Sequence, residues 1–230
     1  MNSVYIYHHL GLGDHIICNG LVRHFAELYG QTFVFTKPVN KINIKRMYSD
    51  NKKITILPMS DQQVREFINI FKSHKYVIAG HTPEFEKKYN DPNLHKNFDE
   101  LFYEDNNIPF IYKWTKFFVE RDLKREKEVY YDIYGLNDDS EFIFVHENPI
   151  YSPVVQNISE NIQKIMPDNK EVGIFDYLYL IEKAKEVHVM NSSFMNLIDC
   201  IQLRNDNIYY HEYARPGINT ILKLNWTIFK

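Results

Sequence analysis

A loop near the amino terminus places two glycines and an acid between an apolar, strand-like run and an amphipathic, helix-like run. The loop reads HLGLGDHI and contains Gly11, Gly13 and Asp14. Glycine lets a ligand approach the backbone closely, and the amides at the start of the next helix can bind an anion. The loop is therefore a candidate site for a phosphate or a polar substrate. It is not a dinucleotide fingerprint, because Ile16 stands where the third glycine belongs, and it lacks the Gly-Lys-Ser/Thr of a P-loop.

Asp14 has two interpretations that the sequence leaves open. As an N-cap, its carboxylate would accept a hydrogen bond from a backbone amide of the first helical turn, which contributes about 1 kcal/mol. As a general base at the carboxyl end of the first strand, it would take the proton from an attacking hydroxyl. His15 and the pair His8 and His9 are candidate helpers, although a histidine near a strand end more often has a structural role.

A second candidate site lies in VHVMNSSFMNLID. Here a strand is expected to end at Asn191, Ser192 and Ser193, and a helix to begin at once. Two hydroxyls and several unpaired amides at such a turn could hold a diphosphate. Asn and Ser are equally the residues that helices favour as N-caps, so the turn is compatible with both roles.

Two further residues could contact the phosphates of a ligand. His146 in FVHENP ends an expected strand, where it could hydrogen-bond a phosphate or a sugar hydroxyl, or instead cap its own loop. Arg215 in HEYARP is a candidate cation for a leaving diphosphate, because negative charge grows on that group in the transition state. Pro216 is expected to end the strand and to leave Arg215 at a sheet edge. Tyr151 could stack on a nucleobase.

Strand-like and helix-like segments alternate along most of the chain, which predicts parallel strands joined by right-handed helical crossovers. We therefore predict an α/β fold with two Rossmann-like halves, residues 1–97 and 141–230, joined by a helical connection over 98–140. The expected strands cover 4–8, 32–36, 53–57, 76–79, 142–146 and 186–190, with another in NIYYHEYARP, and the expected helices include 15–29, 62–73, 175–184 and 194–202.

The composition excludes several classes of protein. With 44% hydrophobic residues in 230, the chain can bury a core. Its 27 basic and 30 acidic residues give a net charge of -3, so nothing in the overall charge favours nucleic acid as a partner. Cys18 and Cys200 are too far apart in the sequence to suggest a disulfide framework or a Cys-rich metal site.

No signal peptide and no membrane-spanning run is recognisable, so we expect a cytoplasmic protein without a transmembrane segment. The histidines lack the spacing of metal ligands, an Asp-x-Asp motif is missing, and no Gly-x-Ser-x-Gly elbow is found. We therefore expect neither a metal nor another cofactor. The oligomeric state is left open.

The two turns together resemble the GT-B glycosyltransferases, and most of all the heptosyltransferase-like group. The match consists of GLGDHI after the first strand and FDYLYLIEKAKEVHVMNSSFMNLI later in the chain. The resemblance implies that Asp14 is the catalytic base, in an acceptor-side half. It also implies that Asn191, Ser192 and Ser193 cradle the donor phosphates, where the family has Asp-Ser/Thr-Gly. The segments FVHENP and YYHEYARP also resemble phage and bacterial open reading frames described as sugar-transferase-like.

The resemblance and the residues lead to one expected function and two alternatives. We expect a metal-independent, inverting glycosyltransferase that moves a sugar from a nucleotide-sugar donor to a hydroxyl acceptor, with Asp14 as the base. Ser192, Ser193 and Arg215 would hold the departing diphosphate. The first alternative is a non-catalytic nucleotide- or glycan-binding module, which the asparagine at 191 and the short second half favour. The other is a different nucleotide-using enzyme, against which the missing P-loop argues.

Overall fold

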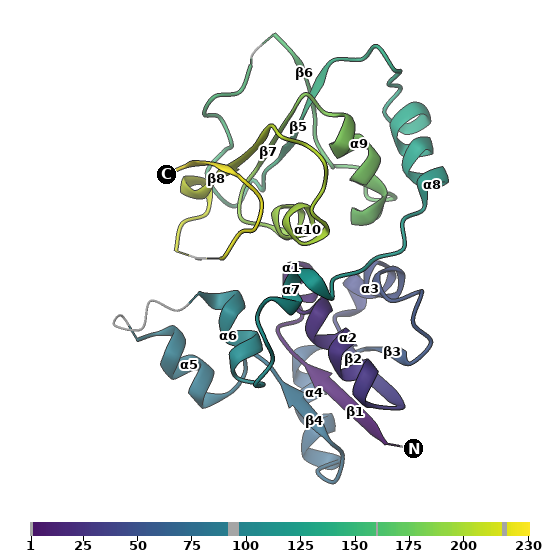
Figure 1. Ribbon diagram of the computed structural model, residues 1–230, viewed down its shortest axis with the longest axis vertical. Helices are drawn as coiled ribbons and strands as arrows, with labels where there is room; N and C mark the ends of the chain where they lie inside the picture. Colours follow the sequence, from purple (N-terminus) through teal and green to yellow (C-terminus); the bar gives the residue numbers. More distant parts are fainter. Residues whose placement is uncertain (1, 92–96, 160, 218–219) are drawn as a thin grey trace. The chain divides into compact units, whose positions relative to one another are not determined.

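Two parallel β-sheets form from the apolar runs of the sequence (Figure 1). The computed structural model describes residues 2–91, 97–159, 161–217 and 220–230. The chain divides into two units, each built on one sheet. Unit 1 contains the described residues through Glu120 together with Thr220 and Ile221, and unit 2 contains the others. The predicted α/β fold is confirmed.

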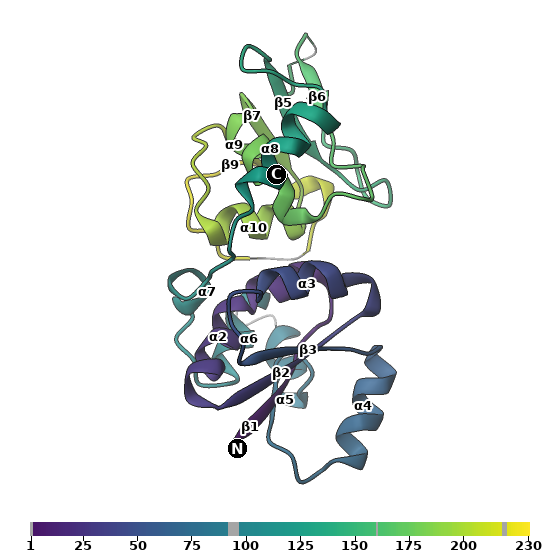
Figure 2. The ribbon, with the colours of Figure 1, turned by 90° about the vertical axis from the view of Figure 1, so that its right-hand side faces the viewer.

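The sheet of unit 1 has the strand order β3-β2-β1-β4, with all neighbours parallel. The chain moves from β1 outward to β3 and then crosses back to β4. Because such crossovers are right-handed, the reversal places α2 and α4 on opposite faces of the sheet, as Figure 2 shows. The strands are β1 (Ser3–Tyr7), β2 (Gln31–Thr36), β3 (Ile54–Pro58) and β4 (Tyr76–Ile78).

The helices of unit 1 include several that the sequence did not predict. The expected helix 62–73 begins at a capping box between Ser60 and Gln63. No helix was expected over the ranges of α3 and α5. The helices are α1 (Leu12–Ile17), α2 (Asn19–Leu28), α3 (Lys41–Met47) after a 3-10 turn at Pro38–Asn40, α4 (Asp61–Ile70), α5 (Pro83–Tyr89), α6 (Phe98–Glu104) and α7 (Tyr112–Thr115).

The single helix expected over 15–29 is wrong, because it is broken at Cys18, whose ψ is 3°. The buried hydroxyl of Tyr103 donates a hydrogen bond of 2.6 Å to the carbonyl of Ile17. In an unbroken helix that carbonyl would accept from the amide four residues on. A contact from far along the chain thus occupies the carbonyl at the end of α1, and α2 begins at Asn19.

A buried ion pair binds the returning segment, Thr220 and Ile221, which is part of unit 1 although most of the C-terminal half belongs to unit 2. Asp99 and Lys113 are both fully buried, with 2.6 Å between Oδ2 and Nζ. Lys113 also donates to the carbonyl of Ile221 at 2.7 Å, and the hydroxyl of Thr220 donates to Asp99 at 2.7 Å. A buried charge is costly unless it is paired and hydrogen-bonded, so these contacts depend on one another.

The sheet of unit 2 has the strand order β6-β5-β7-β8-β9, again with parallel neighbours. The strands are β5 (Phe142–His146), β6 (Gln163–Ile165), β7 (Glu186–Val189), β8 (Ile208–His211) and β9 (Thr227–Phe229). The helices are α8 (Leu123–Glu128), α9 (Leu178–Lys183) and α10 (Ser193–Ile201), with a π-helical turn at Val129–Ile133 and 3-10 turns at Ile174–Tyr177 and Glu212–Ala214.

The helices over 98–140 do not form a body of their own. Residues 98–120 belong to unit 1 and residues 121–140 to unit 2. Arg121, the first residue of unit 2, hydrogen-bonds to the carboxylates of Glu126 and Glu182, which holds α8 against α9. The predicted boundaries of the two halves and of the connection stay a prediction.

Candidate functional site

The carboxyl ends of β1 and β4 form the topological switch point of unit 1. The chain leaves β1 toward β2 on one side, and β4 lies on the other. In open α/β sheets this is the position at which ligands bind. The GLGD loop follows β1 directly, and Gly80 and His81 follow β4. The fold thus places Asp14 near the carboxyl edge that the sequence analysis expected.

Asp14 is the third residue of α1, and the N-cap is Gly11, whose backbone is extended. The N-cap interpretation of Asp14 is therefore wrong. A side chain at Gly11 would place its Cβ 2.5 Å from the Oδ2 atom of Asp14, so the glycine leaves room for the half-buried carboxylate beside the loop. Gly13 lies in the first turn of α1. Whether Asp14 acts as a base stays a prediction.

The imidazoles of His8 and His15 pack together in the interior, with ring centroids 4.4 Å apart. Burial lowers the pKa of His8 to about 4 and lowers the pKa of His15 well below its ordinary value. Both rings are neutral at pH 7. Within the described part of the chain, Nε2 of His8 and both nitrogens of His15 have no hydrogen-bond partner. His15 is therefore a buried neighbour of Asp14 and not a cation exposed to a ligand.

The loop after β4 contributes residues that the sequence analysis missed. Gly80 has a φ of +81°, which favours glycine, and its carbonyl lies 2.6 Å from Nε2 of His9. His81 stacks on Tyr7 with 4.3 Å between centroids, and burial lowers its pKa to about 4. The dipeptide Gly-His directly after a strand was the available signal. A cavity of about 410 Å³ beside this loop is lined by Tyr7, Arg65, Ile68, Asn69, Ile78, His81 and Glu86.

The switch point of unit 2 lies between β5 and β7, and two predicted segments follow these strands. His146 is the last residue of β5, and Asn191, Ser192 and Ser193 come just after β7. The amide of Met190 donates to the carbonyl of His146 at 3.3 Å, which ties the two strand ends together. The structure thus brings the predicted phosphate-binding residues of this half to one edge of one sheet.

Ser192 is the N-cap of α10, because its Oγ accepts a hydrogen bond from the amide of Met195 at 3.4 Å. The capping interpretation of this turn is confirmed. Ser193 is the first residue of the helix and is half-buried, whereas Asn191 is buried. Because the first amides of a helix have no partner within it, the turn keeps the donors that an anion needs.

His146 lies against Phe194, the second residue of α10, with ring centroids 4.7 Å apart. Its Nδ1 atom is buried and has no hydrogen-bond partner among the described residues. Burial lowers the pKa of His146 to about 4, so the ring is neutral at pH 7. It can donate or accept one hydrogen bond, but it cannot supply positive charge to a phosphate.

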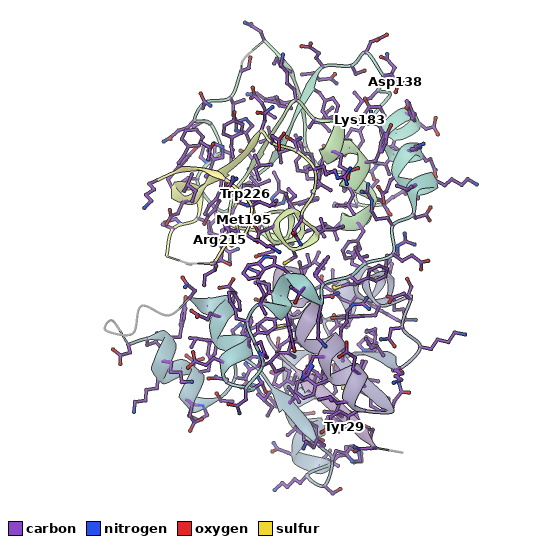
Figure 3. The ribbon with its side chains drawn as sticks, in the orientation of Figure 1. Tyr29, Asp138, Lys183, Met195, Arg215 and Trp226 are labelled. Atoms are coloured by element: carbon purple, nitrogen blue, oxygen red, sulfur yellow. The ribbon has the colours of Figure 1, made fainter. Side chains whose placement is uncertain are left out.

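Arg215 lies next to the same turn. Its guanidinium donates to the carbonyl of Asn191 at 3.2 Å and stacks over the ring of Tyr151 at 4.9 Å. The expected position at a sheet edge is wrong, because β8 ends at His211 and lies between β7 and β9. Arg215 instead follows a 3-10 turn that carries it back to α10. Figure 3 labels Arg215 together with Met195 of that helix.

Two solved structures with the same fold are glycosyltransferases. One is a glycosyl transferase of family 9 from Veillonella parvula DSM 2008, with a TM-score of 0.59, 9% identity, and coverage of 99% of this chain and 86% of that one. The other is the ADP-heptose LPS heptosyltransferase II of E. coli, with a TM-score of 0.58, 11% identity, and coverage of 100% and 90%. The chain has a GT-B-like glycosyltransferase fold. At these identities the likeness shows the fold alone, and at that level it confirms the predicted resemblance.

Comparisons by sequence add nothing to this likeness. No protein-family description matches the chain, and no curated protein does. Over the residues that the structure describes, no group of three or more His, Cys, Asp or Glu side chains is arranged to hold a metal ion. In the same residues, every helix is too short or too polar to span a bilayer.

Proposed function

We propose that this protein transfers a sugar from a nucleotide-sugar donor to a hydroxyl acceptor. The proposal rests on the carboxyl edge of unit 2, where His146, Ser193, Asn191 and Arg215 surround the start of α10. A helix amino terminus, a neutral hydrogen-bonding ring and a guanidinium are groups that bind a diphosphate. The GT-B-like fold supports this use of the edge.

In the proposed reaction, the carboxylate of Asp14 takes the proton of the acceptor hydroxyl. The acceptor oxygen forms a bond to the anomeric carbon from the face opposite the leaving group. The bond between that carbon and the diphosphate oxygen breaks, and its electron pair leaves with the nucleoside diphosphate. Because the acceptor oxygen attacks opposite the leaving group in a single displacement, the anomeric configuration inverts, and the acceptor proton stays on the carboxyl group of Asp14.

Charge on the departing diphosphate would be balanced by Arg215 and by the amides of α10, without a metal. Asn191 stands where the resembling family has an acid. An amide at this position places no negative charge beside the diphosphate, so the guanidinium of Arg215 acts unopposed from this turn. A preorganised cation and amides stabilise developing charge better than water does, because they need not reorganise during the reaction.

A second candidate function is a module that binds a nucleotide or a glycan without turnover. The hydroxyl of Ser192 is engaged in capping α10, and Arg215 already stacks on the ring that would otherwise face a nucleobase, that of Tyr151. A donor would have to displace or share these contacts. Such a site could bind a nucleotide weakly and still fail to activate it.

Screening of nucleotide sugars separates the two functions. ADP-, GDP-, UDP-, CMP- and dTDP-sugars are first tested for a rise in melting temperature, because a ligand of the native state stabilises it. Those that bind are incubated with a panel of glycan acceptors, and the released nucleotide is measured, which is CMP for a CMP-sugar and a nucleoside diphosphate for the others. Release that depends on the acceptor supports transfer, and binding without release supports the module. If no nucleotide sugar binds, sugar transfer and nucleotide binding are both contradicted, and only a glycan-binding module is left.

A further inference from the structure

A continuous chain of four polar side chains crosses β7 and β8 on one face of the unit 2 sheet. Nε2 of His188 lies 3.1 Å from the carboxylate of Glu186, and its Nδ1 lies 3.0 Å from Nε2 of His211. Nδ1 of His211 lies 3.2 Å from the hydroxyl of Tyr213. Both imidazoles are fully buried, and all four of their nitrogens have a partner within the protein.

The two ends of the chain fix the direction of every hydrogen bond. A carboxylate only accepts, so Nε2 of His188 donates to Glu186, and in a neutral ring Nδ1 then accepts from Nε2 of His211. At the other end, the oxygen of Tyr213 accepts from the amides of Val155 at 3.0 Å and Gln156 at 3.2 Å. Its own hydrogen is then free to donate to Nδ1 of His211. Burial lowers the pKa of both imidazoles, and with both rings neutral the two ends give the same direction of bonds.

The hydroxyl of Tyr213 joins this chain to the loop that follows β5, residues 147–156, here called the donor loop. The amide of Ser152 in the loop donates to the carbonyl of Ala214 at 3.2 Å, and the ring of Tyr151 lies under Arg215. The donor loop is therefore fastened to the turn that carries Arg215. The loop begins directly after His146, and the turn ends at Arg215.

We propose that Glu186, His188, His211 and Tyr213 form a positioning network, the histidine clamp, that holds the donor loop and Arg215 in place for the donor diphosphate. This inference rests on the proposed function, because it assigns the clamp to the same site. The clamp touches no substrate itself. It acts through the hydroxyl of Tyr213, which accepts hydrogen bonds from the donor loop. Among the hydrogen bonds of the residues that the structure describes, no other side chain of the network bonds to this loop.

The clamp should loosen as the pH falls. Protonation of either imidazole turns its acceptor nitrogen into a donor. That nitrogen then faces another donor, and the hydrogen bond between them is lost. Burial lowers the pKa of His211 to about 4, whereas an open clamp would return it toward its ordinary value of 6.5. Opening that exposes His211 thus becomes up to about tenfold more favourable for each pH unit below 6.5. The groups that face the two rings are Glu186, Lys164, Tyr209, Tyr213 and Phe229.

The test compares Tyr213→Phe with Tyr209→Phe in the full chain. Both variants lose one phenolic hydroxyl, and Tyr209 stacks on His188 without contributing its hydroxyl to the chain of bonds. Amide hydrogen exchange of Val155 and Gln156 reports the clamp, and titration with ADP, GDP and UDP reports the site. We expect Tyr213→Phe to raise exchange and to weaken nucleotide binding, each by about tenfold, and Tyr209→Phe to change neither.

The pH dependence supplies a readout that a loss of packing would not give. From pH 7 to pH 5, protection of the two amides should fall in the wild type more than in Tyr213→Phe, whose loop is already released. Glu186→Gln, whose side-chain oxygen still accepts a hydrogen bond, should keep the wild-type protection at pH 7.

Each contrary result has its own meaning. Unchanged exchange in Tyr213→Phe, or parallel pH profiles, would overturn the clamp. Raised exchange with unchanged nucleotide affinity would overturn its positioning role. If the wild type bound none of the three diphosphates and none of the nucleotide sugars of the screen, the proposed function and the positioning role would fail together, while the exchange data would still decide whether the clamp holds the loop.

Discussion

Asp14 is oriented by a glycine three residues before it. The carboxylate of Asp14 occupies the space that a side chain at Gly11 would need, and the extended backbone of Gly11 starts the helix that carries the acid. The glycine is required here for space and not for an unusual backbone angle, since its φ is -71°. The role of Gly11 is therefore to leave space for the carboxylate of Asp14, and not to contact a ligand itself.

Gly11→Ala should displace the carboxylate of Asp14 and reduce sugar transfer by about 10- to 100-fold, because small misplacements of a reacting group are costly. Nucleotide affinity should stay unchanged, since Gly11 belongs to unit 1 and the diphosphate contacts belong to unit 2. Gly30→Ala is the control, because its Cβ would meet its nearest neighbour at an ordinary 3.5 Å. Steady-state kinetics check this prediction, and equal rates for the two variants would contradict it.

Residues at strand ends could be predicted from the sequence, and residues paired across strands could not. Asn191 and Ser192 follow a recognisable apolar run, so their place at a sheet edge needs only local information. The contact of Arg215 with Tyr151 and the chain from His188 to His211 depend on strand order and register. The periodicity of a single sequence gives neither the strand order nor the register. The edge position expected for Arg215 was wrong for this reason.

The amino end of α10 has a structural role, the N-cap, and a proposed role in nucleotide binding. Substitutions of Ser192 and Ser193 can separate these two roles. Ser192 caps the helix through its hydroxyl, whereas Ser193 is the first helical residue. Ser192→Ala should lower the free energy of unfolding by about 1 kcal/mol. Ser193→Ala should leave stability nearly unchanged and weaken nucleotide binding. Urea unfolding and nucleotide titration of both variants check this division, and weaker binding only in Ser192→Ala would contradict it.

Strands formed by apolar runs were predicted well, and mostly exposed strands and an interrupted helix were not. The expected strands over 4–8, 32–36, 53–57, 76–79, 142–146 and 186–190 agree with the structure to within one residue at each end. The strands β6 and β9 were missed. Each has three residues, as β4 does, but two of the three are exposed in both strands, so no buried run marks them. The break at Cys18 was missed because it follows from the hydroxyl of Tyr103, 86 residues away from Ile17.

At the scale of the molecule, buried neutral histidines recur in both units. Burial lowers the pKa of His8 in unit 1 and of His211 in unit 2 to about 4, from an ordinary value of 6.5. Below pH 6.5 the unfolded chain therefore binds protons that the folded chain excludes. The stability that these residues contribute is fully present above pH 6.5 and is lost as the pH falls toward 4.

The free energy of unfolding should therefore fall between pH 6.5 and pH 4, by up to about 1.4 kcal/mol per pH unit for each fully buried histidine that ionises on unfolding. Urea unfolding at pH 7.5, 6 and 5 measures this slope. His8→Asn should have a shallower slope than the wild type, because asparagine does not titrate. Constant stability from pH 7.5 to pH 5 would contradict this view of the interior.

Near its end the chain passes from unit 2 into unit 1 and back again, which the periodicity of the sequence does not predict. Thr220 and Ile221 belong to unit 1 through the pair of Asp99 and Lys113, and the chain then re-enters unit 2. There Asp199 accepts hydrogen bonds from the backbone amides of Lys223 and Leu224 and from the indole of Trp226, which Figure 3 labels. Two buried aspartates, one in each unit, thus fix this segment.

The central claim is that Asp14 accepts the proton of the acceptor in sugar transfer. The most direct measurement is acceptor-dependent release of nucleoside diphosphate by the wild type and by Asp14→Asn, with Asp139→Asn, a change at an exposed turn, as the control. We expect a loss of about 100-fold or more in Asp14→Asn, with nucleotide affinity retained and the control fully active. Turnover by Asp14→Asn at the rate of the wild type would contradict it.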